Sequence, residues 1–142
     1  MIEPVSFPFV EAYPDPSGAS LIPLLPLTLT CQGQSITTAG MLDSGAAISV
    51  LPHSAGLALG LVWEDSHRPL TLSGNLSSVP ARGVVLVATV AHFPQVRLVF
   101  AWAQTDQAPL LLGQMNFFKE FNVCFFRSQS VFEIAPAQAE AQ

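Results

Sequence analysis

The sequence predicts an all-β protein, either a small closed barrel or a closed sandwich, on three observations. Twelve prolines and nine glycines among 142 residues interrupt the chain too often for long helices. The apolar runs between them are short and β-rich, and turn residues recur roughly every ten positions. Only residues 114–121, "QMNFFKEF", show convincing helical spacing, through Phe117, Phe118 and Phe121. We therefore expect one short helix, near the C-terminus.

The N-terminal half is expected to contain an arm and a hairpin. Residues 1–19 hold four prolines and no periodicity, which predicts an extended arm with one short edge strand in "VSFPFV". The segments "LIPLLPLTLTC" and "SITTAGMLDS" flank the turn "QGQ" and predict a β-hairpin. The segment "ISVLP" predicts a further strand, and "HSAGLALGL" predicts a single helical turn.

The C-terminal half continues the pattern of short strands. Two strands are expected around the turn residues "SGNLSS", and "QVRLVFAWA" alternates as a strand does. The loop "QTDQAP" leads to a short buried strand, "LLLG", and "NVCFFRSQSVFEIA" predicts a last hairpin. One domain is therefore expected over residues 20–135, followed by a disordered tail over 136–142.

The composition excludes several classes of function. Mean hydropathy is +0.46 and only 11% of residues are charged, but every apolar run is too short to span a membrane. The N-terminus lacks a basic segment followed by an apolar one, so no secretory signal is expected. We expect a soluble, cytoplasmic protein whose apolar surface serves as an oligomer interface. A net charge of -5 with five basic residues argues against nucleic-acid binding.

The cysteines and histidines do not predict a metal site. Cys31 and Cys124 lie far apart in apolar segments, which is typical of buried thiols rather than of a disulfide framework. His53, His67 and His92 show no spacing typical of zinc ligands. No metal and no cofactor are expected.

One carboxylate, Asp43, lies between two apolar stretches of this weakly charged chain. In "AGMLDSGAAISVLP", Met41 and Leu42 precede it, and Ser44 and Gly45 follow it. An acid in such a setting costs free energy unless it is hydrogen-bonded, and it often has a function. One explanation is structural: Asp43 caps a turn by accepting hydrogen bonds from the next two amides. The other explanation is catalytic.

Residues 41–46 resemble the signature of the retropepsin-like aspartic proteases, which is two apolar residues, Asp, Ser or Thr, Gly and Ala. A second mark of that family is an apolar run that ends in Gly and opens a helix. Here it is "LLLG", in which Gly113 follows Asp43 by seventy positions. The resemblance covers about residues 20–134 and is closer to the single-domain cellular and bacterial members than to the viral ones. It implies a closed acid-protease β-barrel with one short C-terminal helix.

The resemblance also implies an aspartic endopeptidase with Asp43, Ser44 and Gly45 as its catalytic segment. Peptide hydrolysis by this route uses two carboxylates about 3 Å apart that share one proton. One carboxylate acts as general base on a water molecule, and the other protonates the substrate carbonyl. Gly45 permits a close backbone approach, and Ser44, by resemblance, bonds across to the partner loop.

The second carboxylate must come from a second copy of the chain. The sequence contains one Asp-Ser-Gly, and neither Asp15, Asp65 nor Asp106 is followed by a hydroxyl residue and Gly. A two-fold axis would place Asp43 beside its own symmetry mate. The expected assembly is a homodimer that acts on a peptide or protein substrate.

By the same resemblance, "TLSGNLSSVPARG" forms a hairpin flap over the site, and the loop "TDQAP" lines the substrate groove. The flap tip is expected near Gly74 and Asn75. The full set of expected substrate-binding residues is Ala46, Ala47, Ser73, Gly74, Asn75, Ala108 and Pro109.

Two positions depart from the viral pattern. Ala47 stands where the viral enzymes usually carry an acid, and Gln114 stands where they carry the Arg that pairs with it. Both partners are missing together, so no unpaired charge is left. The departure leaves an alternative open: a catalytically inactive module of the same fold, used for dimerisation or peptide binding. An unrelated barrel that binds a small apolar ligand is a further possibility.

Overall fold

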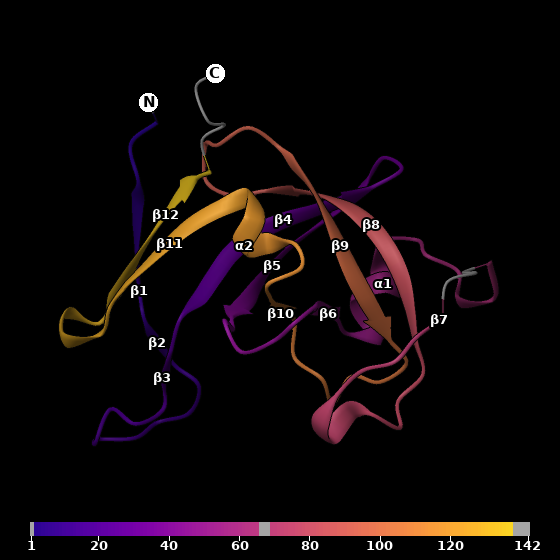
Figure 1. Ribbon diagram of the computed structural model, residues 1–142, viewed down its shortest axis with the longest axis horizontal. Coiled ribbons are helices and arrows are strands. Elements are labelled where there is room, and N and C mark those ends of the chain that lie inside the picture. The colour runs from indigo at the N-terminus through magenta and orange to yellow at the C-terminus, as the bar shows by residue number, and fades with distance from the viewer. Residues whose placement is uncertain (1, 66–68, 138–142) are drawn as a thin grey trace.

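The structure is a computed structural model that describes residues 2–65 and 69–137 (Figure 1). Six strands form a closed barrel, in the spatial order β4-β5-β10-β6-β9-β8, and the pairing of β4 with β8 closes the ring. The bounds of these strands are β4 (Leu24–Cys31), β5 (Gln34–Leu42), β6 (Ser49–Leu51), β8 (Ala81–Thr89), β9 (Val96–Ala103) and β10 (Leu111–Leu112). The all-β closed barrel expected from the sequence is confirmed.

The hairpin of β4 and β5 forms at the expected place. Gln32 and Gly33 make the turn with φ angles of 49° and 84°, and Cys31 pairs with Gln34. Along β4, Leu25, Leu27 and Leu29 alternate with more exposed residues and point into the barrel. Alternation of this kind buries one face of a strand and fixes its register.

A smaller antiparallel sheet packs against the barrel. Its order is β1 (Val5–Pro8), β12 (Val131–Pro136) and β11 (Phe121–Phe126). The N-terminal segment therefore contains the expected edge strand. The ring of Phe7 stacks on that of Phe132 at 5.5 Å. Farther along, β2 (Val10–Glu11) pairs with β3 (Leu21–Ile22), so much of the expected arm lies against the domain.

The described residues form two short α-helices, where the sequence predicts one helix and one helical turn. The C-terminal helix, α2 (Phe117–Glu120), is shorter than the expected 114–121. Met115 instead forms an isolated parallel β-bridge with Ile48, and the N–H groups of Gln114 and Met115 donate to the carbonyl oxygens of Ala46 and Ala47. The second helix, α1 (His53–Ala58), corresponds to the expected helical turn.

Cys124 differs from the sequence expectation, because its side chain is exposed, and Cys31 is half-buried. Both are free thiols. Within residues 2–65 and 69–137, no helix is long and apolar enough to cross a membrane. The expected tail lies mostly outside the described residues: Pro136 ends β12, and 138–142 are not described. His67 also lies outside the described residues.

Candidate active site

Asp43 stands at the end of β5, where β5 runs parallel to β10. Leu111 and Leu112 are in register with Met41 and Leu42. The N–H of Asp43 donates to the carbonyl oxygen of Leu112 at 3.0 Å. The position of the carboxylate is thus set by a strand that follows it by about seventy residues.

The carboxylate of Asp43 also shapes the loop that follows it. Its Oδ1 accepts a hydrogen bond from the N–H of Gly45 at 3.0 Å. The backbone carbonyl oxygen of Asp43 accepts another from the N–H of Ala46 at 3.1 Å. Asp43 is half-buried, and Ser44 and Gly45 are exposed. An Asp that only capped a turn would make the same contacts, so these two hydrogen bonds do not distinguish a catalytic Asp from a structural one.

Gly113 brings the second signature segment against the Asp43 loop. A Cβ atom at this position would lie 2.7 Å from the carbonyl oxygen of Ala46 and 2.8 Å from that of Ile48. Real side chains do not approach backbone so closely, so only glycine fits here. The two segments that carry the family resemblance are therefore in direct contact.

Ser49 joins the same two segments from inside the protein. Its buried hydroxyl accepts from the N–H of Gly113 at 3.0 Å and donates to the carbonyl oxygen of Met115 at 3.3 Å. Ser49 is not among the site residues expected from the sequence. The one available signal was a lone hydroxyl in the apolar run "ISVLP", because a buried polar group usually has a partner.

Gln114 takes part in the site although it replaces the viral Arg. Its Nε2 donates to the carbonyl oxygen of Ser44 at 2.8 Å. Ala47 opposite offers no acid to pair with. A neutral hydrogen bond thus holds the Asp43 loop from this position.

A small apolar pocket of about 70 Å³ opens beside the Asp43 loop. It brings together three of the expected substrate-binding residues: Ala46, Ala47 and Ser73. The complete lining is Ala46, Ala47, Ile48, Val50, Leu72, Ser73, Leu76 and Leu111. Gly74 and Asn75 lie in the same loop as Ser73 but are exposed and do not line the pocket.

The segment expected to be a flap is a hairpin with a long connection. Strand β7 (Pro69–Leu70) pairs with β8 through two residue pairs, Pro69 with Arg82 and Leu70 with Ala81. Between the strands, Gly74–Leu76 forms a single 3-10 turn, and Gly74 has φ of +65°. The pairing is short because the connection is rich in serine and ends at Pro80.

The loop expected to line the substrate groove, residues 105–109, is held by contacts away from the pocket beside Asp43. Ala108 is 2% exposed and packs in an apolar cluster with Val50 and Leu72, and Pro109 is exposed. Neither lines the pocket beside Asp43. Asp106 accepts a hydrogen bond from the N–H of Ser54 at 2.7 Å, in the first turn of α1. The bonds from Ser54 lower the pKa of the Asp106 carboxyl, and His53 lowers it further.

A second, larger apolar pocket of about 320 Å³ adjoins the first. Ile48 lines both, so the two depressions meet at this residue. The other lining residues are Leu70, Gly83, Val84, Val85 and Val99. None of the lining residues of either pocket is charged. The described residues contain no group of three His, Cys, Asp or Glu side chains that could hold a metal ion.

Comparison with known proteins identifies the fold. No protein-family model matches the sequence, and no curated protein matches it. Among solved structures, the chain is similar to a retropepsin-like aspartic protease from Rickettsia conorii, with a TM-score of 0.60 and 12% sequence identity. The match covers 93% of this chain and 91% of that one. The fold is retropepsin-like. At this identity the likeness concerns the fold alone.

Proposed function

We propose that the protein is an aspartic endopeptidase that acts as a homodimer, with Asp43 of each copy supplying one catalytic carboxylate. The observation that carries the proposal is the joining of Asp43 and Gly113 in one hydrogen-bonded loop pair, beside an uncharged pocket, on a retropepsin-like barrel. A turn-capping Asp would not require a glycine seventy residues later to pack on its loop.

The proposed reaction needs both carboxylates with one shared proton. The ionised Asp43 takes a proton from water, whose oxygen attacks the peptide carbonyl carbon. The protonated Asp43 of the other copy gives its proton to the carbonyl oxygen. As the C–N bond breaks, the leaving nitrogen gains a proton, and a carboxylic acid and an amine are released.

The residues around Asp43 fit supporting roles in this reaction. A Cβ at Gly45 would lie 3.3 Å from Oδ1 of Asp43, so glycine leaves the carboxylate unobstructed. Ser44 is exposed and available for a contact with the second copy. In our proposal, the loop of residues 71–80 covers the bound peptide as a flap, and the uncharged pockets favour apolar side chains near the scissile bond.

The test compares wild type with Asp43→Asn on an unfolded protein substrate, from about pH 4 to 7, the range that a shared-proton dyad can serve. Asp15→Asn is the matched control, because Oδ1 of Asp15 also accepts from a backbone N–H two residues on, at 3.0 Å, away from the site. We expect cleavage by wild type and Asp15→Asn, and none by Asp43→Asn. Inert dimers that bind peptide would instead favour the non-catalytic alternative.

A further inference from the structure

The outer face of the hairpin formed by β8 and β9 carries an apolar stripe that leads away from the candidate site. The paired residues on this face are Ala81 with Ala103, Gly83 with Ala101, Val85 with Val99, and Val87 with Arg97. The alanines are buried with Val50 and Leu72, which line the pocket beside the Asp43 loop, whereas Val85 is 55% exposed. The stripe therefore begins beneath the loop of residues 71–80 and continues into open surface.

Three depressions follow the stripe and share lining residues. Ile48 lines both the pocket of about 70 Å³ and the pocket of about 320 Å³. Val85 lines the larger of these and also a third depression of about 260 Å³. The described lining of the third is Thr30, Cys31, Gln32, Val85, Leu86, Val87 and Arg97. The second and third depressions together form one groove, here called the outer groove, which runs from Ile48 to Arg97.

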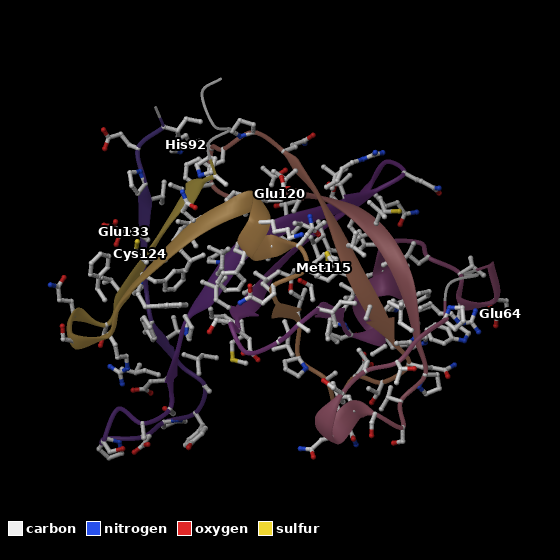
Figure 2. The ribbon with its side chains drawn as sticks, in the orientation of Figure 1. Glu64, His92, Met115, Glu120, Cys124 and Glu133 are labelled. Carbon is white, nitrogen blue, oxygen red and sulfur yellow. The ribbon has the colours of Figure 1, made fainter. Side chains whose placement is uncertain are left out.

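Met115 and Ile48 border the outer groove on the side of the Asp43 loop. The two residues pair in a β-bridge, and Oδ1 of the next residue, Asn116, accepts a hydrogen bond from the N–H of Val99 at 2.8 Å. Met115 is 47% exposed and is labelled in Figure 2. Large apolar side chains that are exposed singly need no explanation, but those that gather in one patch mark a binding surface. Met115 and Val85 are gathered in this way.

The backbone of Val85 offers a place for an extended peptide to bind. Because the N–H of Val99 is bonded to Asn116, Val85 and Val99 form a non-hydrogen-bonded pair, and Val85 directs its N–H and C=O groups away from β9. On that side, β7 pairs with β8 only as far as Arg82, and β4 pairs with it only from Val87 onward. Within the described part of the chain, no strand pairs with Val85 there. Both groups are therefore available to one residue of an added strand.

Arg97 gives the far end of the outer groove a positive charge. It is exposed, and it is the one charged residue in the described lining of the three depressions. Its carbonyl oxygen accepts a hydrogen bond from Nδ2 of Asn116 at 3.0 Å, which holds its backbone in place. Among residues 2–65 and 69–137, no carboxylate forms an ion pair with its guanidinium. A guanidinium in this position suits the carboxylate of a ligand.

We propose that the outer groove binds a flank of the substrate, outside the catalytic site, as an extended segment with apolar side chains at alternate positions and a carboxylate near Arg97. The inference rests on the proposed function, because the occupant is the peptide that is cut at Asp43. Ile48 makes the groove continuous with the pocket beside Asp43. From Ala81 to Val87 the stripe spans about 20 Å, the length of about six extended residues. In a homodimer, each copy supplies one such groove for one flank.

Three synthetic peptides with the same central Leu-Phe bond test the outer groove. One is flanked by Gly-Ser repeats, one by Val-Ser repeats that end in Glu, and one by Val-Ser repeats that end in Lys. Fluorescence anisotropy with Asp43→Asn, which should bind without cleaving, measures their affinity. We expect the Glu-ended peptide to bind more tightly than the Gly-Ser peptide. Val85→Thr in the same background should weaken binding of the Glu-ended peptide about four-fold, the effect of one buried methylene group.

Val62→Thr is the matched control for Val85→Thr. Val62 is 49% exposed and lines none of the three depressions, so this variant should bind as Asp43→Asn does. Circular dichroism establishes that both variants fold. Equal affinity for all three peptides, or equal effects of the two substitutions, would overturn the inference. Sedimentation that shows Val85→Thr converting a dimer to monomers would also overturn it, because a second copy would then cover the stripe.

A second pair of variants tests the charge at the end of the groove. At low salt, Asp43→Asn should bind the Glu-ended peptide roughly two- to five-fold more tightly than the Lys-ended one, the range of an exposed ion pair. Arg97→Gln should abolish this preference. Lys119→Gln changes the net charge equally, and Lys119 is exposed and lines none of the depressions, so the preference should remain. A preference that survives Arg97→Gln would overturn the role given to Arg97.

Cleavage of the same peptides by the chain with Asp43 intact separates this inference from the proposed function. If Asp43→Asn binds the peptides in the expected order and wild type cleaves none of them, the groove stands and the function fails. If wild type cleaves all three with the same kcat/KM, and Val85→Thr does not change it, the function stands and the groove fails.

Discussion

The buried hydroxyl oxygen of Ser49 accepts a hydrogen bond from the N–H of Gly113 at 3.0 Å, across 64 positions of the chain. The same hydroxyl donates to the carbonyl oxygen of Met115 at 3.3 Å. One side chain on β6 thus satisfies both a donor and an acceptor of the segment that supports the Asp43 loop. Its removal would leave the N–H of Gly113 buried without that partner.

Replacing Ser49 with alanine should therefore destabilise the protein. A buried donor left unpaired costs about 1–3 kcal/mol, so the free energy of unfolding of Ser49→Ala should fall by that amount. Urea unfolding followed by fluorescence measures it. Ser78→Ala, at an exposed position, is the control and should match wild type. Equal stability of both variants would contradict the role given to Ser49.

Gly113→Ala should be at least as damaging. The added methyl group would press on the carbonyl oxygens of Ala46 and Ile48, and backbone atoms cannot move aside as a flexible side chain does. Overpacking of this kind costs roughly 1–3 kcal/mol, occasionally more. We expect a lower urea midpoint and loss of cleavage. A fully active Gly113→Ala with the wild-type midpoint would show that the loop tolerates a larger separation.

The charge of Asp106 should stabilise the loop over residues 104–109 at neutral pH. Hydrogen bonds from Ser54 lower the pKa of Asp106 below its ordinary value of 3.8. A carboxyl with a depressed pKa contributes stability that is present above the unfolded-state pKa and is lost as pH falls through the folded-state pKa. Asp106→Asn should thus melt at a lower temperature than wild type at pH 7.

The same argument predicts how this difference changes with acid. As pH falls below 3.8, wild-type Asp106 becomes neutral like Asn, and the two melting temperatures should converge. Gln107→Ala, an exposed neighbour, serves as the control and should follow wild type throughout. A gap that stays constant from neutral to acid pH would mean that the charge of Asp106 contributes nothing.

Filling the pocket beside Asp43 should change specificity more than stability. Ala47 lines the pocket and is exposed, so Ala47→Leu places a larger side chain in a volume of about 70 Å³. One extra or missing methylene group in such a pocket changes discrimination roughly 10- to 200-fold. We expect kcat/KM to fall for peptides with Phe or Leu beside the scissile bond.

Peptides with Ala at the same position provide the control for this variant, because a small side chain does not compete with the new leucine. Their kcat/KM should change little. An equal loss for both sets of peptides would indicate that Ala47→Leu disturbs the Asp43 loop rather than the pocket.

Much of the fold could be predicted from local patterns. The alternation in β4 and the turn at Gln32 and Gly33 specify a hairpin without any knowledge of the rest of the chain. The contacts of Ser49 and Asp106 could not be found in this way, because each partner is more than fifty positions away. The structure gives a shorter α2 than the sequence predicts for the same reason: Met115 pairs with the distant Ile48 in a β-bridge, and the local helical pattern contains no sign of that.

The expected substrate-binding residues also differ in whether the local sequence could predict their positions. Ala46 and Ala47 follow Asp43 directly, and the structure places both in the pocket wall. Ala108 was expected from its place in a loop, but loop residues can point inward, and this one fills the space beside Val50. The proposed catalytic role of Asp43 remains a prediction until the variants described above are assayed.

The parallel pairing of β5 with β10 has a consequence for the timing of folding. Leu42 and Leu112 must meet before the backbone of Asp43 acquires its partner, and contacts of such long sequence separation slow folding. A nascent chain exposes Asp43 well before Leu112 and Gly113 have left the ribosome. The candidate site can therefore be completed only after Leu112 and Gly113 have been synthesised, so a nascent chain that ends before them would lack a formed site.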